Sequence, residues 1–170
     1  GNSTCPGSTI DGAVFQGNTA AAMGGAISFD AGATVTDTVF VANSTSGTNG
    51  AYDAWGGANV LVNDVFLANV APSSGGAVGL GTPSSTLNAT NCTFWNNNGG
   101  SAGGAIAAGE YGSSLTVVNS ILYDDLPSEL NYTAGAPSLT YSDIEGIAPD
   151  GSLHLIAQNP GYYIVHDDVL

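Results

Sequence analysis

The sequence predicts an all-β fold, a single-domain right-handed parallel β-helix of about five to six coils. Two repeated motifs carry this prediction. In the first, a Phe stands three residues before an Asn, in four copies spaced 25, 26 and 28 residues apart: Phe15–Asn18, Phe40–Asn43, Phe66–Asn69 and Phe94–Asn97. In the second, each copy is followed by Gly-Gly-Ala. A repeat of this length indicates stacked copies of one structural unit.

The Gly-Gly-Ala motif predicts where the third strand of each coil begins, because Gly permits a tight corner and close approach between layers. Its first Gly lies nine residues after the Phe in three copies and sixteen after it in the second copy. The four occurrences are Gly24–Ile27, Gly56–Asn59, Gly75–Val78 and Gly103–Ile106. A fifth, degenerate copy has Leu122 in the place of Phe and Asp125 in the place of Asn.

The residues before each Phe predict two further strands and the turn between them. Apolar residues recur at alternate positions, which is typical of a strand. Seven residues before the Phe stand Ala33, Asn59, Leu87 and Leu115, and five before it stand Ile10, Val35, Leu61, Ala89 and Val117. Three before it is a polar column of Asp37, Asn63, Asn91 and Asn119, which predicts a turn because a short polar side chain can cap its own backbone.

We therefore expect one domain over residues 1–170, with 1–14 as the first coil or cap and 145–170 as a C-terminal cap or strand. Extra residues are expected in Ser44–Trp55, and Leu80–Ser85 is a predicted Gly/Pro/Ser turn. One more strand and turn is expected in Leu139–Ile144. An ordinary all-β sandwich is the alternative fold, because it would also bury the Phe residues.

In a β-helix, like residues of successive coils stack on one another. The four Phe residues should form one interior column, each contributing about 1.5–3 kcal/mol through burial. Asn18, Asn43, Asn69 and Asn97 should form a hydrogen-bonded ladder beside that column.

The composition excludes some partners. The chain has no Lys or Arg and 14 Asp and Glu, so its formal net charge is −14. Nucleic acid and anionic membranes are poor partners, since no cation is present to neutralise phosphate. Self-repulsion at this charge is relieved by acid, salt or calcium, which favours an extracellular setting. Drift or habitat is an alternative explanation of the missing cations.

Two cysteines leave the compartment open. Cys92 should face inward as a buried thiol, and Cys5 belongs to the first coil. Three coils at roughly 4.8 Å each would separate them by about 14 Å, too far for a disulfide. Cys5 is then free at the cap or paired with another chain. No apolar run reaches the 18 residues that a membrane-spanning helix needs, so we expect no membrane insertion.

The Gly-Gly-Ala-Ile and Phe-x-x-Asn motifs resemble the repeats of polymorphic outer-membrane proteins, which are autotransporter adhesins. The segments Asn119–Asp125, Leu139–Glu145 and Asn159–Pro160 resemble the closing part of secreted right-handed β-helix proteins. This resemblance spans about Ile10 to Tyr163 and implies a secreted or cell-surface solenoid. The chain departs from those proteins in lacking Lys and Arg, and Asn159 stands where they carry Asp.

An enzyme acting on polysaccharides is one alternative function, since the β-helix fold also hosts lyases and glycoside hydrolases. The usual lyase base, a cationic side chain, is missing. Hydrolysis needs two carboxyl groups on one face, and the candidates are Asp37 with Asp64 and Asp124 with Asp125. Asp in place of a turn Asn explains these residues better, so no residue is assigned a catalytic role. Carbohydrate binding through Tyr52, Trp55 and Trp95 is a further alternative.

Calcium is the one cofactor the sequence suggests, because oxygen ligands are abundant. The candidate ligands are Asp124, Asp125 and Glu129. His154 and His166, the two histidines, form no metal signature. Asn2, Asn88 and Asn131 are the better candidates for N-glycosylation among the Asn-x-Ser/Thr sites, whereas Asn43 and Asn91 should belong to ladders or turns.

The expected function is that of an extracellular structural or adhesive solenoid. Possible partners are glycans or a cell surface. Unpaired strand edges at the ends of a solenoid invite addition of another copy, and such head-to-tail contact can propagate into a filament. The residues expected at the assembling ends are Cys5, Ile10, Tyr162, Tyr163, Ile164 and Val165.

Overall fold

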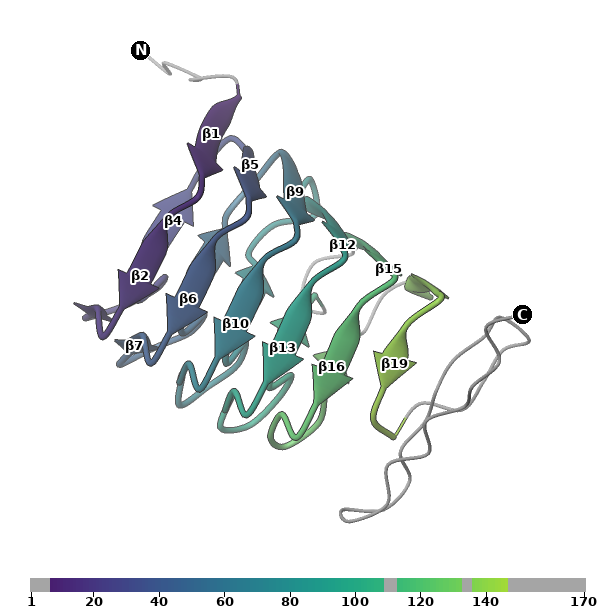
Figure 1. Ribbon diagram of the computed structural model, residues 1–170. Helices are drawn as coiled ribbons and strands as arrows, with labels where there is room; N and C mark the ends of the chain where they lie inside the picture. Colours follow the sequence, from purple (N-terminus) through teal and green to yellow (C-terminus); the bar gives the residue numbers. More distant parts are fainter. Residues whose placement is uncertain (1–6, 109–112, 133–135, 147–170) are drawn as a thin grey trace.

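The protein is a right-handed parallel β-helix of about five turns (Figure 1). The computed structural model describes residues 7–108, 113–132 and 136–146. These ranges contain strands and turns and no helix. Cys5, Asn2, both histidines and Tyr162–Val165 lie outside the described residues, as does most of the expected cap over 145–170.

Each coil contributes one strand to each of three parallel sheets. The first sheet contains β1 (Ser8–Asp11), β5 (Ala33–Thr36), β9 (Ala58–Val62), β12 (Thr86–Thr90), β15 (Ser114–Val118) and β18 (Ser138–Thr140). The second contains β2 (Val14–Gln16), β6 (Val39–Val41), β10 (Val65–Leu67), β13 (Thr93–Trp95), β16 (Ile121–Tyr123) and β19 (Asp143–Ile144). The third contains β4 (Ile27–Phe29), β8 (Tyr52–Ala54), β11 (Val78–Leu80), β14 (Ile106–Ala107) and β17 (Leu130–Asn131). A two-stranded sheet pairs β3 (Thr19–Ala20) with β7 (Ser44–Thr45).

The predicted Phe column is confirmed. Phe15, Phe40, Phe66 and Phe94 are register partners in the second sheet, and Leu122 continues the column. Their rings stack face to face, with centroids 5.0, 4.6 and 4.8 Å apart and planes within 7° of parallel. All but Phe15, which belongs to the first coil, are fully buried. This stack fixes the register of the coils, because a slip by one residue would move every ring to the solvent side.

The predicted Asn ladder is also confirmed. At each rung the side-chain Oδ1 accepts two hydrogen bonds from the Asn of the preceding coil, one from its backbone N and one from its Nδ2. For Asn69 accepting from Asn43 these distances are 2.9 and 3.0 Å. Asn69 Nδ2 also donates to the backbone oxygen of Phe40 at 3.0 Å. Each buried amide therefore ties together three coils.

The predicted turn column has left-handed backbone geometry. Asp37, Asn63, Asn91 and Asn119 have φ between 50° and 58°, a region that Asn and Asp tolerate better than most residues. Their exposed side chains form a second ladder along the outside, in which each Asn donates its Nδ2 to the residue one coil before it.

The Gly-Gly-Ala assignment in the second copy is wrong. Tyr52, not Asn59, is the register partner of Ile27 and Val78, so the equivalent segment is Asn49–Tyr52. The second Gly of the motif is the demanding position: a Cβ on Gly50 would overlap the carbonyl oxygen of Gly76 in the next coil. The first position requires positive φ, which Asn49 adopts at 64°. Gly56–Gly57 instead precede β9.

The prediction of extra residues in Ser44–Trp55 is wrong for the same reason. Residues in this stretch pair with residues 25 positions earlier in the chain, which is also the offset between Phe15 and Phe40. Phe29, for example, pairs with Ala54. The next coil has the extra residues. Leu80 lies 26 residues after its partner Ala54, whereas Thr86 lies 28 after its partner Ala58, so two residues are added between them. They fall in the predicted turn, where Ser85 Oγ donates to the backbone oxygen of Ala54 at 3.0 Å.

The last described coil confirms the strand and turn expected in Leu139–Ile144. Leu139 pairs with Val117 in the first sheet and Ile144 pairs with Leu122 in the second. Within the described ranges, no helix has the length and apolar character that crossing a bilayer requires.

Candidate functional site

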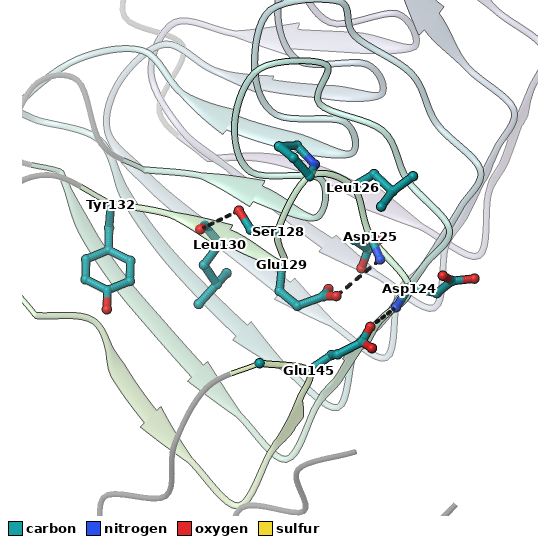
Figure 2. Close-up of a pocket in the computed structure, with 10 residues that line it drawn as sticks. Asp124, Asp125, Leu126, Ser128, Glu129, Leu130, Tyr132 and Glu145 are labelled. Carbon is teal, nitrogen blue, oxygen red and sulfur yellow. Dashed lines mark hydrogen bonds between the residues drawn. The ribbon is translucent and has the colours of Figure 1, made fainter. Parts of the chain in front are cut away.

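A pocket of about 510 Å³ lies beside the turn that follows β16 (Figure 2). It collects four of the chain's carboxyl groups. Its lining residues are Asp124, Asp125, Leu126, Pro127, Ser128, Glu129, Leu130, Tyr132, Glu145 and Gly146. Asp125 and Glu129 are buried, whereas Asp124 is exposed and its carboxylate points away from the Asp125–Glu129 pair in Figure 2.

Asp125 is the last rung of the interior Asn ladder. Its Oδ1 accepts from the backbone N and the Nδ2 of Asn97, at 2.6 and 2.7 Å, as an Asn Oδ1 does in the earlier coils. Its own backbone N donates to Glu129 Oε1 at 3.2 Å. Two coils earlier, the equivalent donor, Asn69 N, bonds the Oδ1 of the next Asn, Asn97. Glu129 thus reaches back four residues to supply the acceptor that a further Asn would have provided.

A carboxyl pair can replace the amide pair only by holding a proton. Asp125 Oδ2 and Glu129 Oε2 are buried without a hydrogen-bond partner among the described residues. Burial raises the pKa of Glu129 far above its usual range, and its hydrogen bond to Asp125 raises that pKa further. Burial also raises the pKa of Asp125, against the opposing effect of its hydrogen bonds. Both shifts run in the direction that retains a proton, and we conclude that the pair shares one proton at neutral pH.

The calcium hypothesis gains no geometric support. Asp124 faces away from the pair, and its backbone N donates to Glu145 Oε2 at 2.9 Å. Across residues 7–108, 113–132 and 136–146, no group of three or more His, Cys, Asp or Glu side chains is arranged to hold a metal ion. The acidic residues are close in sequence, but they alternate between the inside and the outside of the solenoid.

The same alternation separates the carboxyl pairs considered for hydrolysis. Asp64 is fully buried and accepts from the backbone N of Thr38 at 2.8 Å and of Val62 at 3.1 Å. Burial raises its pKa to about 6. Asp37 is exposed in the turn column. Asp124 and Asp125 likewise face opposite sides. In each pair one carboxyl group is buried and the other exposed, so neither pair presents two carboxyl groups on one face, as glycoside hydrolysis requires.

The three aromatic residues considered for carbohydrate binding do not form one site. Tyr52 is fully buried, and its hydroxyl donates to Asn59 Oδ1 at 2.6 Å. The prediction that Tyr52 contacts a ligand is wrong, because the residue belongs to a strand of the third sheet and not to a loop. Trp55 and Trp95 are exposed, but Trp55 follows β8 whereas Trp95 belongs to β13.

Sequence reasoning missed a buried acid in the third sheet. Asp53 is fully buried and accepts from Ser28 Oγ and Asn49 Nδ2, each at 2.6 Å. The misplaced Gly-Gly-Ala motif had put this segment in a loop. With Asn49–Tyr52 in register, Asp53 would have been expected in a strand.

The outside of the second sheet is an exposed, mainly apolar surface. In each of its first five strands the middle residue points inward and the two flanking residues point outward. The first outward row is Val14, Val39, Val65, Thr93 and Ile121, and the second is Gln16, Val41, Leu67, Trp95 and Tyr123. We call these ten residues the outer face. They include no charged residue, and Figure 1 shows their strands side by side.

Apolar side chains of the outer face are in contact with solvent. Val14 is 66% exposed, Trp95 52% and Ile121 48%, and the other apolar members are half-buried. The turn ladder of Asp37, Asn63, Asn91 and Asn119 runs along the edge of this face that adjoins the first sheet. Acidic residues enter the sheet only at β19, where Asp143 pairs with Ile121.

The candidate glycosylation residues differ in accessibility. Asn88 is exposed on β12 and Asn131 is half-buried on β17. Asn43 is a buried ladder rung and Asn91 a turn residue, as expected. Cys92 is a buried free thiol, also as expected.

Comparisons with protein-family models, with curated proteins and with solved structures gave no match.

Proposed function

We propose that this chain is an extracellular structural and adhesive β-solenoid that attaches to another surface through the outer face. The observation that carries the proposal is the apolar, uncharged outer face on a protein whose net charge is −14. Contiguous exposed apolar surface of this kind is uncommon on monomeric soluble proteins and marks interaction sites. The parallel register holds the face rigid, since each of its strands is hydrogen-bonded to its neighbours.

The experiment compares two variants that each add one negative charge on an outward-facing strand position. Leu67→Asp places the charge in the middle of the outer face, and Asn88→Asp places it on the first sheet. We expect Leu67→Asp to reduce adsorption of the chain to a phenyl-bearing resin several-fold, with Asn88→Asp close to wild type. Equal adsorption of the two variants would exclude the outer face as the attachment surface.

End-to-end assembly into a filament is a second candidate. It is favoured by the terminal strands: among the described residues, β1 and β18 each pair on one side only, which leaves one edge of each without a strand partner. Electron microscopy of the purified chain in calcium, in high salt and at low pH tests this candidate. Filaments under any of these conditions support it, and monodisperse particles under all of them argue against it.

A further inference from the structure

We infer that the ligand of the outer face is a neutral polysaccharide, which lies across the stacked coils. This inference rests on the proposed function, because it names the class of ligand that the outer face binds.

Charge narrows the choice of ligand. The chain carries no Lys or Arg and a net charge of −14, so an anionic polymer is repelled, and a second copy of the chain is repelled unless acid, salt or calcium relieves the charge. The outer face has no carboxylate of its own to pair with a cationic ligand. Binding on this face must therefore come from apolar contact and from hydrogen bonds between uncharged groups.

The outer face and its edge offer both kinds of contact. The outer face consists of aliphatic side chains, of Thr93 and Gln16, and of Trp95 beside Tyr123, its register partner on the next strand. The edge is the turn ladder, which has amide side chains after Asp37. Asn91 donates one hydrogen bond in this ladder and accepts another. An amide has two donor hydrogens and two acceptor lone pairs, so this ladder leaves hydrogen-bonding capacity free.

A sugar ring matches this arrangement, since its C–H face is apolar and its rim carries hydroxyl groups. Aromatic and aliphatic side chains pack on the ring face, and amides bond the rim. The five strands extend over four strand spacings of about 4.8 Å each, or roughly 19 Å. A surface of that length and of uniform character fits several consecutive rings of an extended polymer better than a single small molecule.

The experiment measures binding of the full chain to insoluble cellulose and curdlan, which are neutral glucans, and to polygalacturonate coupled covalently to beads in calcium-free buffer, which is anionic. The test variant is Trp95→Ala and the matched control is Trp55→Ala, which removes the other exposed tryptophan, away from the outer face. Asn91→Gly removes one amide of the ladder and suits the left-handed backbone at that position.

We expect binding to at least one neutral glucan, weakened about tenfold by Trp95→Ala and less by Asn91→Gly, with Trp55→Ala unchanged. No binding should occur to polygalacturonate. Adsorption to the phenyl-bearing resin that depends on Leu67, without binding to either glucan, would overturn this inference and leave the proposed function standing. Glucan binding that Trp55→Ala weakens and Trp95→Ala does not would overturn both.

Discussion

The interior ladder of Asn18, Asn43, Asn69 and Asn97 and its end at Asp125 and Glu129 solve one problem in two ways. Every rung must supply an acceptor to the coil before it and find an acceptor for its own backbone N. An Asn meets both needs with a neutral amide at any pH. The carboxyl pair supplies the same acceptors, but two neighbouring carboxylates can be buried together at low cost only while one of them holds a proton. The contribution of the ladder to stability should therefore be independent of pH at its Asn rungs and dependent on pH at its carboxyl end.

Removing a middle rung should have the largest effect. Asn69→Ala leaves the backbone N of Asn43 without its acceptor and removes two further hydrogen bonds, one from Asn43 Nδ2 and one to the carbonyl oxygen of Phe40. Each buried unsatisfied group costs about 1–3 kcal/mol, so we expect a loss of about 4 kcal/mol in the free energy of unfolding, measured with urea. Asn88→Ala, at an exposed strand position, is the control and should change stability by less than about 0.5 kcal/mol. Similar effects of the two substitutions would show that the ladder does not hold the coils together.

Completing the ladder with an amide should stabilise the protein. In Glu129→Gln, the side-chain oxygen can accept from the backbone N of Asp125 while its NH₂ donates to the Asp125 carboxylate, and no proton need be taken up. At neutral pH the unfolded chain ionises Glu129 whereas the folded state keeps it protonated, which opposes folding. We expect a gain of roughly 2 kcal/mol at pH 8 that shrinks towards pH 4. Glu145→Gln, in the same pocket but half-exposed, is the control; an equal gain there would refute the shared proton.

A third test asks whether a buried carboxyl inside the stack behaves like the one at its end. Asp64 occupies a column in which Thr38 and Ser120 use hydroxyl groups to accept from the preceding coil. Its raised pKa of about 6 means that the folded state binds its proton more tightly than the unfolded chain. Stability from this group is therefore greatest in acid and falls as pH rises from about 4 to 6.

Asp64→Ser should remove that part of the pH dependence and raise the melting temperature at pH 7 by a few degrees. Asp37→Asn removes the same charge from the exposed turn column and should leave the slope between pH 4 and 6 nearly unchanged. Melting curves of both variants, measured between pH 4 and 6, give the two slopes. An unchanged slope in Asp64→Ser would place the source of the pH dependence elsewhere.

The smallest effect is expected at Cys92, a neutral member of that same column. Its Sγ donates to the backbone oxygen of Thr90 at 3.3 Å, as Ser120 Oγ does to Val118. Cys92→Ser should thus change stability by about 1 kcal/mol or less. Burial raises the pKa of the thiol to about 12, so a disulfide reagent should react only after urea is added. Rapid reaction of the folded protein would show that this column opens to solvent.

Some of the molecule was predictable because its requirements repeat. In each coil from Phe15 to Phe94 the Asn stands three residues after the Phe, and a stacked fold must place like residues over like. The register of the second copy was not predictable from Gly-Gly-Ala alone, since Asn49 can take a left-handed position that Gly occupies elsewhere. The strictly required residue was Gly50, and only the approach of the next coil reveals that requirement.

By itself the sequence determined that the chain winds into a parallel β-helix with an aromatic column and an amide ladder, because both depend on local spacing. Tertiary structure alone decided which side of the wall each acidic or aromatic residue occupies. Asp124 and Asp125 are neighbours in sequence, yet one is exposed and the other buried, and Tyr52 is interior whereas Trp95 is exposed. The physical reason is that side chains alternate between faces along a strand, and that a left-handed turn residue such as Asp124 also redirects its side chain, so which face a residue takes depends on the register of the coils.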